Sequence, residues 1–425
     1  MADSPPKVQS HKWSGGLMTH PPLSRLSTWV RRGVAIGAAA ALALTWAGPA
    51  QAADGSIRSP GDAEYVPGSF IVVLKDASAS RAVVGSDARS LTARHGGALE
   101  RTFGAALRGF AVKSTEAQAR RLAGDSRVAF VQRNLIHRAN AVQPNPPSWG
   151  LDRVDQRNLP LNQSYEYSTT AAGVRAYVID TGIRTTHSDF GGRASIGFDA
   201  VGDGQNGQDC NGHGTHVAGT VGGGAFGVAK GVGLVGVRVL NCEGSGTTAQ
   251  VAAGIDWVTA NAQKPAVANM SLGGGADTAL DNAVVRSIGS GVSYAIAAGN
   301  GLFGLFPQNA CSTSPARVPA AITVSVTDNT DTKASWGNYG TCVDIFAPGI
   351  DITSAWNTND TATNTISGTS MSTPHVAGAA ALYLAGHPNA TPQQVRDALV
   401  NNATTGVVKS PGSGSPNKLL YTPGL

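Results

Sequence analysis

Short apolar runs alternate with helix-like segments through the carboxy-terminal part of the chain. Helices are predicted over residues 248–261 and 278–288, between runs rich in Val, Ile and Ala that suit buried strands. These strand candidates are residues 174–179, 235–240, 267–270, 292–297 and 322–326. Apolar strands that alternate with helices are typical of a parallel sheet covered on both faces. The pattern therefore predicts an α/β domain with a doubly wound, mostly parallel sheet.

The last predicted helix has clear signals at its start. Thr391 suits the N-cap, Pro392 suits the first helical position, and Gln394 can complete a capping box. We expect this helix to end near residue 403.

A smaller α+β unit is predicted between residues 68 and 138. Residues 69–74 and 128–131 are strand-like, and residues 78–95 and 114–123 are helix-like. Residues 139–148 contain three prolines and have no apolar periodicity. We interpret this last stretch as an exposed linker.

The amino terminus has the pattern of an export signal. Arg25, Arg31 and Arg32 precede an apolar run over residues 33–46, and residues 50–52 have the small-x-small pattern of a signal-peptidase site. A signal anchor is the alternative, but the run is short for a permanent span. We predict a signal peptide over residues 1–52, a secreted extracellular product, and no stable membrane anchor.

Charge is distributed unevenly along the chain. The whole chain carries 32 Lys and Arg against 27 Asp and Glu, for a net charge of +5. Residues 142–425 contain 14 Lys and Arg against 18 Asp and Glu, so 14 − 18 gives −4. Since the basic residues lie mostly before residue 142, we predict no nucleic-acid partner for the carboxy-terminal domain.

Three polar residues supply an acid, a base and a nucleophile. Asp180 ends an apolar strand, His213 lies in a glycine-rich turn before a helix, and Ser370 opens an apolar run. Imidazole can take the serine proton while the carboxylate fixes its tautomer. The order Asp, His, Ser excludes the chymotrypsin and α/β-hydrolase orders and indicates the subtilisin type. A metal site at His213 and His216 is the alternative, but the HExxH spacing is absent.

The segments over residues 178–182, 211–216 and 367–372 resemble those of the subtilase family, in its proteinase K branch. The similarity runs from Trp149 to Tyr421. It implies a monomeric serine endopeptidase that works through an acyl-enzyme and needs no catalytic cofactor. It also implies that the Asn300 amide helps to form the oxyanion hole.

The resemblance further implies a substrate cleft that reads mainly the peptide backbone. In the family, an extended peptide inserts as a strand between two edge segments, which gives broad specificity toward proteins and peptides. Here these segments are Gly244, Ser245, Gly246 and Ser271, Leu272, Gly273. The wall of the primary pocket corresponds to Ala297, Ala298 and Gly299.

Residues 68–138 resemble the subtilase pro-domain. The family resemblance implies that this unit assists folding and then acts as a transient inhibitor. We place self-cleavage near Ala141–Val142. The expected organisation is therefore a signal peptide (1–52), an inhibitory pro-domain (53–141) and a subtilisin-like peptidase domain (142–425).

Four cysteines are expected to form disulfides in an exported protein. Three pairings are possible from the count alone, and no Cys-x-x-Cys pair supports the zinc alternative. The family resemblance selects Cys210–Cys242 and Cys311–Cys342.

Two groups of oxygen ligands resemble structural calcium sites of the family. Ordinary surface polarity is the alternative for both groups. One group comprises the Pro319 and Ala321 carbonyls with the Asp344 carboxylate. The other comprises Asp152, Asp155, Gln156, Asn162 and Ser164. We predict calcium at one or both sites.

Residues 301–307 depart from the family pattern because they form a longer and more apolar loop. The hypothesis is that this loop borders the primary pocket and favours large apolar substrate side chains. The alternative is that it packs on the body of the protein. Two other functions also stay open, namely a catalytically dead peptide-binding homologue and an esterase or peptide ligase.

Overall fold

The computed structural model describes residues 55–58, 65–75, 81–136 and 141–425. The predicted signal peptide lies outside the described residues, as do residues 78–80 of the first predicted helix. None of the helices in the described ranges is both long and apolar enough to cross a membrane.

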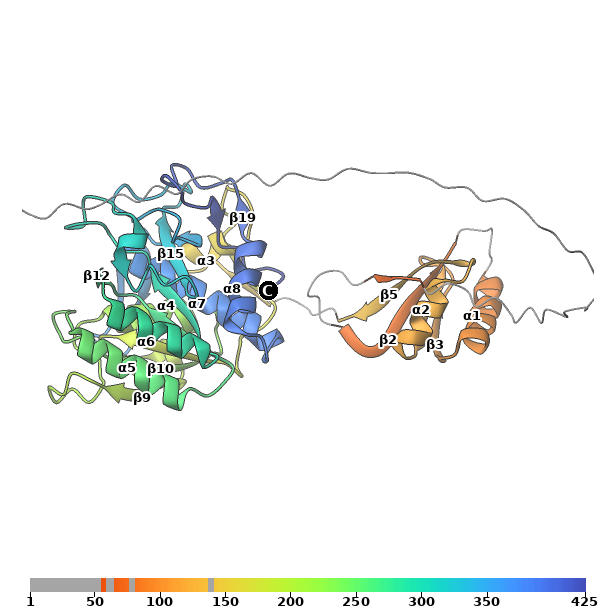
Figure 1. Cartoon of the computed structure of the whole chain (residues 1–425), viewed down its shortest axis with the longest axis horizontal. Coiled ribbons are helices and arrows are strands. Elements are labelled where there is room, and N and C mark those ends of the chain that lie inside the picture. The colour runs from red at the N-terminus through yellow and green to blue at the C-terminus, as the bar shows by residue number, and fades with distance from the viewer. Residues whose placement is uncertain (1–54, 59–64, 76–80, 137–140) are drawn as a thin grey trace, which may run out of the picture. The chain divides into compact units, whose positions relative to one another are not determined.

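A five-stranded sheet and two helices form the predicted α+β unit (Figure 1). Its helices are α1 (Arg81–His95) and α2 (Glu116–Ala123), and the second has the capping box that Thr115 and Gln118 form. In spatial order, its strands are β1 (Ile57–Arg58), β5 (Val128–Leu135), β2 (Tyr65–Leu74), β4 (Gly109–Lys113) and β3 (Ala98–Phe103). Strands β3 and β4 were not predicted. Strand β3 exposes most of its side chains and therefore lacks a buried apolar run, whereas β4 is a short buried strand that the sequence analysis missed.

The carboxy-terminal part of the chain, residues 141–425, is built on a nine-stranded sheet. All its neighbouring strands pair in parallel except β19 with β20. In spatial order, they are β19 (Thr404–Thr405), β20 (Lys418–Leu419), β16 (Ile345–Pro348), β15 (Ile322–Thr327), β13 (Ser293–Ala297), β11 (Ala266–Met270), β8 (Arg175–Asp180), β10 (Gly233–Arg238) and β9 (Ala194–Asp199).

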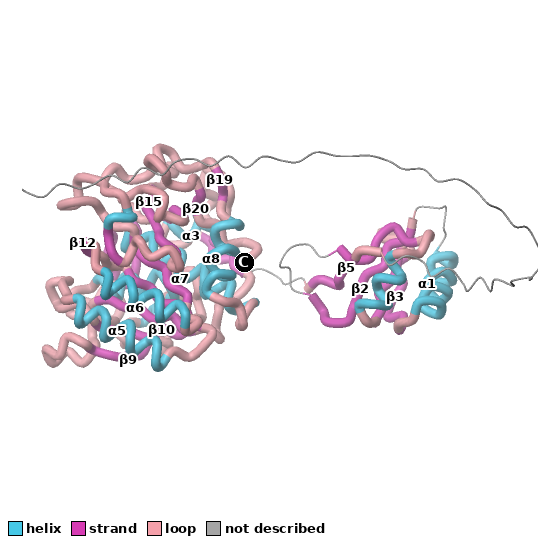
Figure 2. Tube along the Cα trace, in the orientation of Figure 1, coloured by secondary structure: helices cyan, strands magenta, loops and turns pink. Residues whose placement is uncertain are grey.

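Helices cover both faces of this sheet (Figure 2). Alternate side chains of β8 join different apolar clusters: Ala176 and Val178 belong to one, and Tyr177 and Ile179 to the other. On the first face lie α4 (His213–Gly222), α7 (Thr369–Gly386) and α8 (Pro392–Asn402). On the second lie α5 (Thr248–Asn261) and α6 (Thr278–Gly289). The predicted doubly wound α/β fold is therefore confirmed.

The remaining short elements surround this framework. They are β6 (Ala141–Pro144), α3 (Trp149–Val154), β7 (Ser164–Tyr167), η1 (Ser188–Phe190), β12 (Gly274–Gly275), η2 (Ala310–Ser312), β14 (Thr313–Ser314), β17 (Ile352–Ala355) and β18 (Thr363–Ile366).

The predicted linker is wrong over residues 141–144. These residues form β6, which pairs antiparallel with β7 in the register Ala141 to Tyr167 and Pro144 to Ser164. Backbone hydrogen bonds order this strand although most of its side chains are exposed, so no apolar periodicity marks it. The expected cleavage point, Ala141–Val142, lies at the start of the strand.

Two disulfides, Cys210–Cys242 and Cys311–Cys342, have the pairing that the family resemblance implies. Each closes a loop in the carboxy-terminal part, over sequence separations of 32 and 31 residues.

Candidate active site

Asp180 and His213 lie together at the carboxyl edge of the parallel sheet. Asp180 is the last residue of β8 and His213 the first of α4, and His213 Nδ1 lies 2.7 Å from Asp180 Oδ1. The Asp180 side chain is fully buried, whereas that of His213 is 24% exposed. The carboxylate can therefore orient the imidazole while the other ring edge faces the solvent-accessible cleft.

The environment changes the basicity of His213. Burial alone disfavours the imidazolium, but the charge of Asp180 and its hydrogen bond outweigh burial and raise the pKa of His213. The charge of Asp209 adds to this rise. The ring is consequently a stronger base than an isolated histidine.

Ser370 occupies the first turn of α7, close to the positive end of the helix dipole. Its Oγ donates a 3.0 Å hydrogen bond to the Ser271 carbonyl oxygen. Within the described residues, no hydrogen bond joins Ser370 to His213. A serine hydroxyl changes partner by rotation about χ1, and catalytic hydrogen bonds often tighten only with substrate.

Asn300 follows β13 in a turn beside the same helix start. Its Oδ1 accepts hydrogen bonds from Thr369 N at 2.9 Å and Thr369 Oγ1 at 2.8 Å. Because the amide oxygen is held by Thr369, the amide NH₂ can donate elsewhere. Asn300 and Ser370 line the same cavity, so the amide donor and the candidate nucleophile lie on the wall of one cavity.

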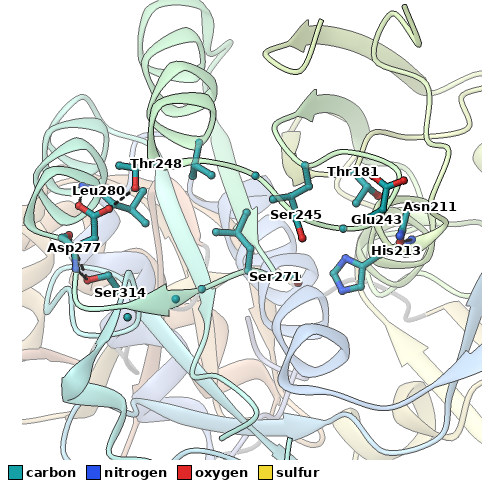
Figure 3. A pocket seen from close by; sticks show the side chains of 18 residues that line it. Thr181, Asn211, His213, Glu243, Ser245, Thr248, Ser271, Asp277, Leu280 and Ser314 are labelled. Carbon is teal, nitrogen blue, oxygen red and sulfur yellow. Dashed lines mark hydrogen bonds between the residues drawn. The ribbon is translucent and has the colours of Figure 1, made fainter. Parts of the chain in front are cut away.

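The two predicted edge segments line a second cavity, together with His213. Figure 3 shows His213 and Asn211 toward one end of this cavity and Asp277 and Ser314 toward the other. The predicted cleft residues along it are Gly244, Ser245, Gly246, Ser271, Leu272 and Gly273.

The cavity beside Ser370 contains the predicted pocket wall of Ala297, Ala298 and Gly299. Leu272 and Gly273 line both cavities, which makes the two adjoining. The predicted catalytic and substrate-binding residues thus line two neighbouring cavities, except Asp180, which is buried against His213.

His216 does not line the cavity that His213 lines. It is fully buried, and its Nε2 lies 2.9 Å from the Ile352 carbonyl oxygen. Burial lowers the pKa of His216 to about 4, so the ring is neutral at ordinary pH. Among the described residues, the three-ligand geometry that could hold a metal occurs only at Asp203 with two disulfide-bonded cysteines. These contacts favour a structural role for His216.

The amino-terminal calcium set fits a bound cation. Asp155 Oδ1 is buried and has no hydrogen-bond partner, although Oδ2 accepts from Glu166 N at 2.6 Å. Burial, with the charges of Asp152 and Glu166, raises the pKa of Asp155 to about 7. A cation there would satisfy the orphaned oxygen and relieve the repulsion.

The other members of this set lie around the same turn. Asp152 accepts backbone hydrogen bonds from Asn162 and Gln163, and Asn162 Oδ1 accepts from Ser164 Oγ at 2.7 Å. Gln156 Nε2 donates to the Pro160 carbonyl oxygen at 2.8 Å. Hydrogen bonds to the Asp152 carboxylate therefore fix the backbone of residues 162–163 beside the acidic groups.

The second calcium set does not fit a cation in the same way. Asp344 Oδ1 forms an ion pair with Arg396, and Oδ2 accepts from Thr323 N at 2.8 Å. A guanidinium therefore already pairs with the carboxylate that was predicted to bind the cation together with the carbonyl groups of Pro319 and Ala321. We propose no calcium at this set.

Asp209 is a buried residue that the sequence did not single out. It accepts hydrogen bonds from Thr181 Oγ1, from the backbone of Asn211 and Gly212, and from Thr215. The signal that could have found it is an acidic residue just before the glycine-rich turn that contains His213.

Comparisons with known proteins agree with this geometry. The profile described as Subtilase family matches residues 172–418, and that described as Peptidase inhibitor I9 matches residues 69–139. An extracellular serine proteinase of Thermus sp. (strain Rt41A) is 54% identical over 377 residues, which cover 85% of this chain and 90% of that protein.

Two further relatives extend the comparison. Alkaline serine exoprotease A of Vibrio alginolyticus is 51% identical, with coverage of 76% of this chain and 60% of that protein. The crystal structure of a cold adapted subtilisin-like serine proteinase matches this chain with a TM-score of 0.62 and a sequence identity of 55%. The match covers 64% of this chain and 97% of the chain in that structure.

Proposed function

Because this chain belongs to the subtilase family and is a serine endopeptidase, we propose that Asp180, His213 and Ser370 are its catalytic triad. The observation that carries this assignment is the 2.7 Å contact between His213 and Asp180, where His213 lines a cavity that adjoins the cavity of Ser370. The raised pKa of His213 suits a general base.

The proposed reaction proceeds through an acyl-enzyme. His213 takes the hydroxyl proton as Ser370 Oγ attacks the scissile carbonyl carbon, and Asp180 stabilises the imidazolium. The tetrahedral intermediate collapses when the imidazolium gives its proton to the leaving amine, which leaves the acyl group on Ser370. Water, deprotonated by His213, then attacks the acyl carbon, and the imidazolium returns this proton to Ser370 Oγ as the second product leaves with a free carboxyl group.

The proposed oxyanion hole combines the Asn300 amide with the Ser370 backbone N–H. Thr369 fixes the amide oxygen of Asn300, so the amide is oriented before substrate binds. A neutral, preorganised donor stabilises the developing oxyanion with little reorganisation.

Protein substrates follow from the endopeptidase family, and we propose broad specificity. The edge segments Gly244–Gly246 and Ser271–Gly273 offer mainly backbone groups to an extended peptide. Backbone pairing is insensitive to side-chain identity, which leaves selection to the adjoining pocket.

The I9 match makes the amino-terminal unit an inhibitor-type pro-domain and a transient partner of the peptidase. We propose that the chain is exported with a signal peptide over residues 1–52 and is secreted, in keeping with the extracellular proteinase of Thermus sp. that it resembles. Self-cleavage near Ala141–Val142 would then release a monomeric enzyme. We also propose one structural calcium ion at the Asp155 set.

Intact-mass measurement of the full chain tests the nucleophile and the processing together. The wild type is expected to shorten to a start near Val142, whereas Ser370→Ala should keep its pro-domain. Ser372→Ala is the matched control, because Ser372 is buried and its Oγ donates to the Ala347 carbonyl oxygen. Shortening of Ser370→Ala to the same mass would contradict self-cleavage, and peptide hydrolysis by this variant would contradict the nucleophile assignment.

A further inference from the structure

Residues 301–306 form a small hairpin beside Ser370's cavity. Leu302 N donates to the Phe306 carbonyl oxygen at 2.8 Å, and Phe306 N donates back at 3.2 Å. Gly301, Phe303 and Gly304 all have positive φ values, which make the turn tight. The segment is thus hydrogen-bonded rather than irregular.

The hairpin presents an unusual concentration of apolar surface. Its four large side chains are 47% to 83% exposed, and Phe303 is the most exposed of them. Within residues 141–425, only Val142 and Val285 are other large aliphatic or aromatic residues with comparable exposure. Contiguous exposed apolar groups of this kind mark binding surfaces. Their exposure also argues against packing on the body of the protein.

Only one side of the hairpin borders the cavity. Leu302 and Phe303 line it together with Gly299, Asn300 and Ser370. Leu305 and Phe306 are absent from that lining although they are equally apolar. The chain therefore offers an internal comparison between apolar residues that meet the cavity and apolar residues that do not.

The backbone of Phe303 carries a further sign of function. Its φ of 55° lies in the left-handed region, which is unfavourable for a residue that has a Cβ atom. Glycine would adopt this conformation without that cost. Of the non-glycine residues with positive φ in the described ranges, Phe303 is the one that combines this backbone with a highly exposed aromatic ring beside a cavity, which makes it a candidate for a binding role.

We propose that Leu302 and Phe303 are specificity-determining residues that extend the wall of the primary pocket and bind a large apolar substrate side chain before the scissile bond. This inference rests on the proposed function. The ring of Phe303 adds apolar contact area that a small side chain such as alanine cannot use. Discrimination between large and small apolar side chains increases with such contact.

Phe303→Gly separates a binding role from a structural one. The substrates are two tetrapeptide p-nitroanilides that differ only in Phe or Ala before the scissile bond. We expect the Phe-over-Ala ratio of kcat/KM to fall about tenfold, with the Ala substrate nearly unaffected and Tm unchanged or raised. Leu302→Ala should lower the ratio in the same direction. Phe306→Ala, outside the cavity lining, should leave it unchanged.

An unaltered ratio in Phe303→Gly, or an equal fall in Phe306→Ala, would overturn the inference. A fall in both substrates together with a lower Tm would assign the ring to stability and would also overturn it. Failure of the proposed catalytic function is distinguished by the wild type, which would then hydrolyse neither substrate.

Discussion

Thr181 Oγ1 donates a 2.9 Å hydrogen bond to Asp209 Oδ1 and so joins the segment that follows Asp180 to the segment that precedes His213. The same hydroxyl oxygen accepts from Gly214 N at 2.9 Å, within the first turn of α4. Asp209 is thus a buried carboxylate that ties together the two loops from which the acid and the base project.

Asp209→Asn is expected to move the acidic limb of the pH profile of kcat/KM to lower pH. The Asp209 charge raises the pKa of His213, so its removal lets the neutral, active imidazole persist to lower pH. The substitution also places an NH₂ group or a weaker acceptor against backbone donors, which should lower the free energy of unfolding by about 1–3 kcal/mol.

The control for this profile is Asp256→Asn, which removes an equal charge from an exposed position on α5. An identical pH profile in wild type and Asp209→Asn would contradict the electrostatic role and leave Asp209 as a structural residue alone.

Asn300→Ala is expected to lower kcat by about 10² to 10³-fold with little change in KM. The reason is that the amide donor meets a full negative charge only in the tetrahedral intermediate. Steady-state kinetics on a p-nitroanilide substrate measure both parameters. Thr369→Val should show a smaller loss, since it removes only one of the two bonds that hold the Asn300 oxygen. A change confined to KM would assign Asn300 to ground-state binding.

Calcium removal is expected to lower the Tm of enzyme inactivated with a sulfonyl fluoride, which prevents self-digestion during heating. Binding at 100 times the dissociation constant contributes about 2.7 kcal/mol. Asp155→Asn should abolish the response to chelator, whereas Asp344→Asn should retain it. Equal responses of these two variants would contradict the assignment of calcium to Asp155.

The calcium-free enzyme should also lose stability as pH rises. The folded pKa of Asp155 is raised to about 7, above its ordinary value of 3.8, so the folded state holds a proton that the unfolded state has released. The stability that this proton confers is present at pH 4 and is lost as pH passes through about 7. Differential scanning calorimetry at pH 5 and pH 8, with and without calcium, measures the effect, which calcium should suppress.

Arg396→Ala is expected to destabilise the protein by about 1.5–3 kcal/mol, because it leaves the largely buried Asp344 carboxylate without its cationic partner. Urea unfolding of the inactivated enzyme measures the loss. Arg286→Ala, which removes an exposed arginine on α6, is the control. A loss no larger than that of the control would mean that the Asp344–Arg396 pair is unimportant for stability.

Local sequence signals predicted the framework well where they coincide with burial. The helix at Thr248–Asn261 has the predicted bounds, and Thr391 and Gln394 form the expected capping box. Central strands such as β8 and β11 were predictable because both of their faces are buried, so that nearly every residue is apolar. In contrast, β3 and β6 expose most of their side chains and are held by cross-strand backbone bonds, which no residue pattern encodes.

For this protein, the sequence by itself determined the family, the chemistry and the identity of the residues that we propose as catalytic, because short motifs with required residue types can be recognised along the chain. Only the tertiary structure decided which side chains lie in contact or line the same cavity. It joined Asp209 to Thr181, paired Asp344 with Arg396, left Asp155 Oδ1 without a partner, and brought Phe303 to the cavity of Ser370. These relationships depend on contacts between residues distant in the chain, and such contacts exist only once the sheet and its helices have packed.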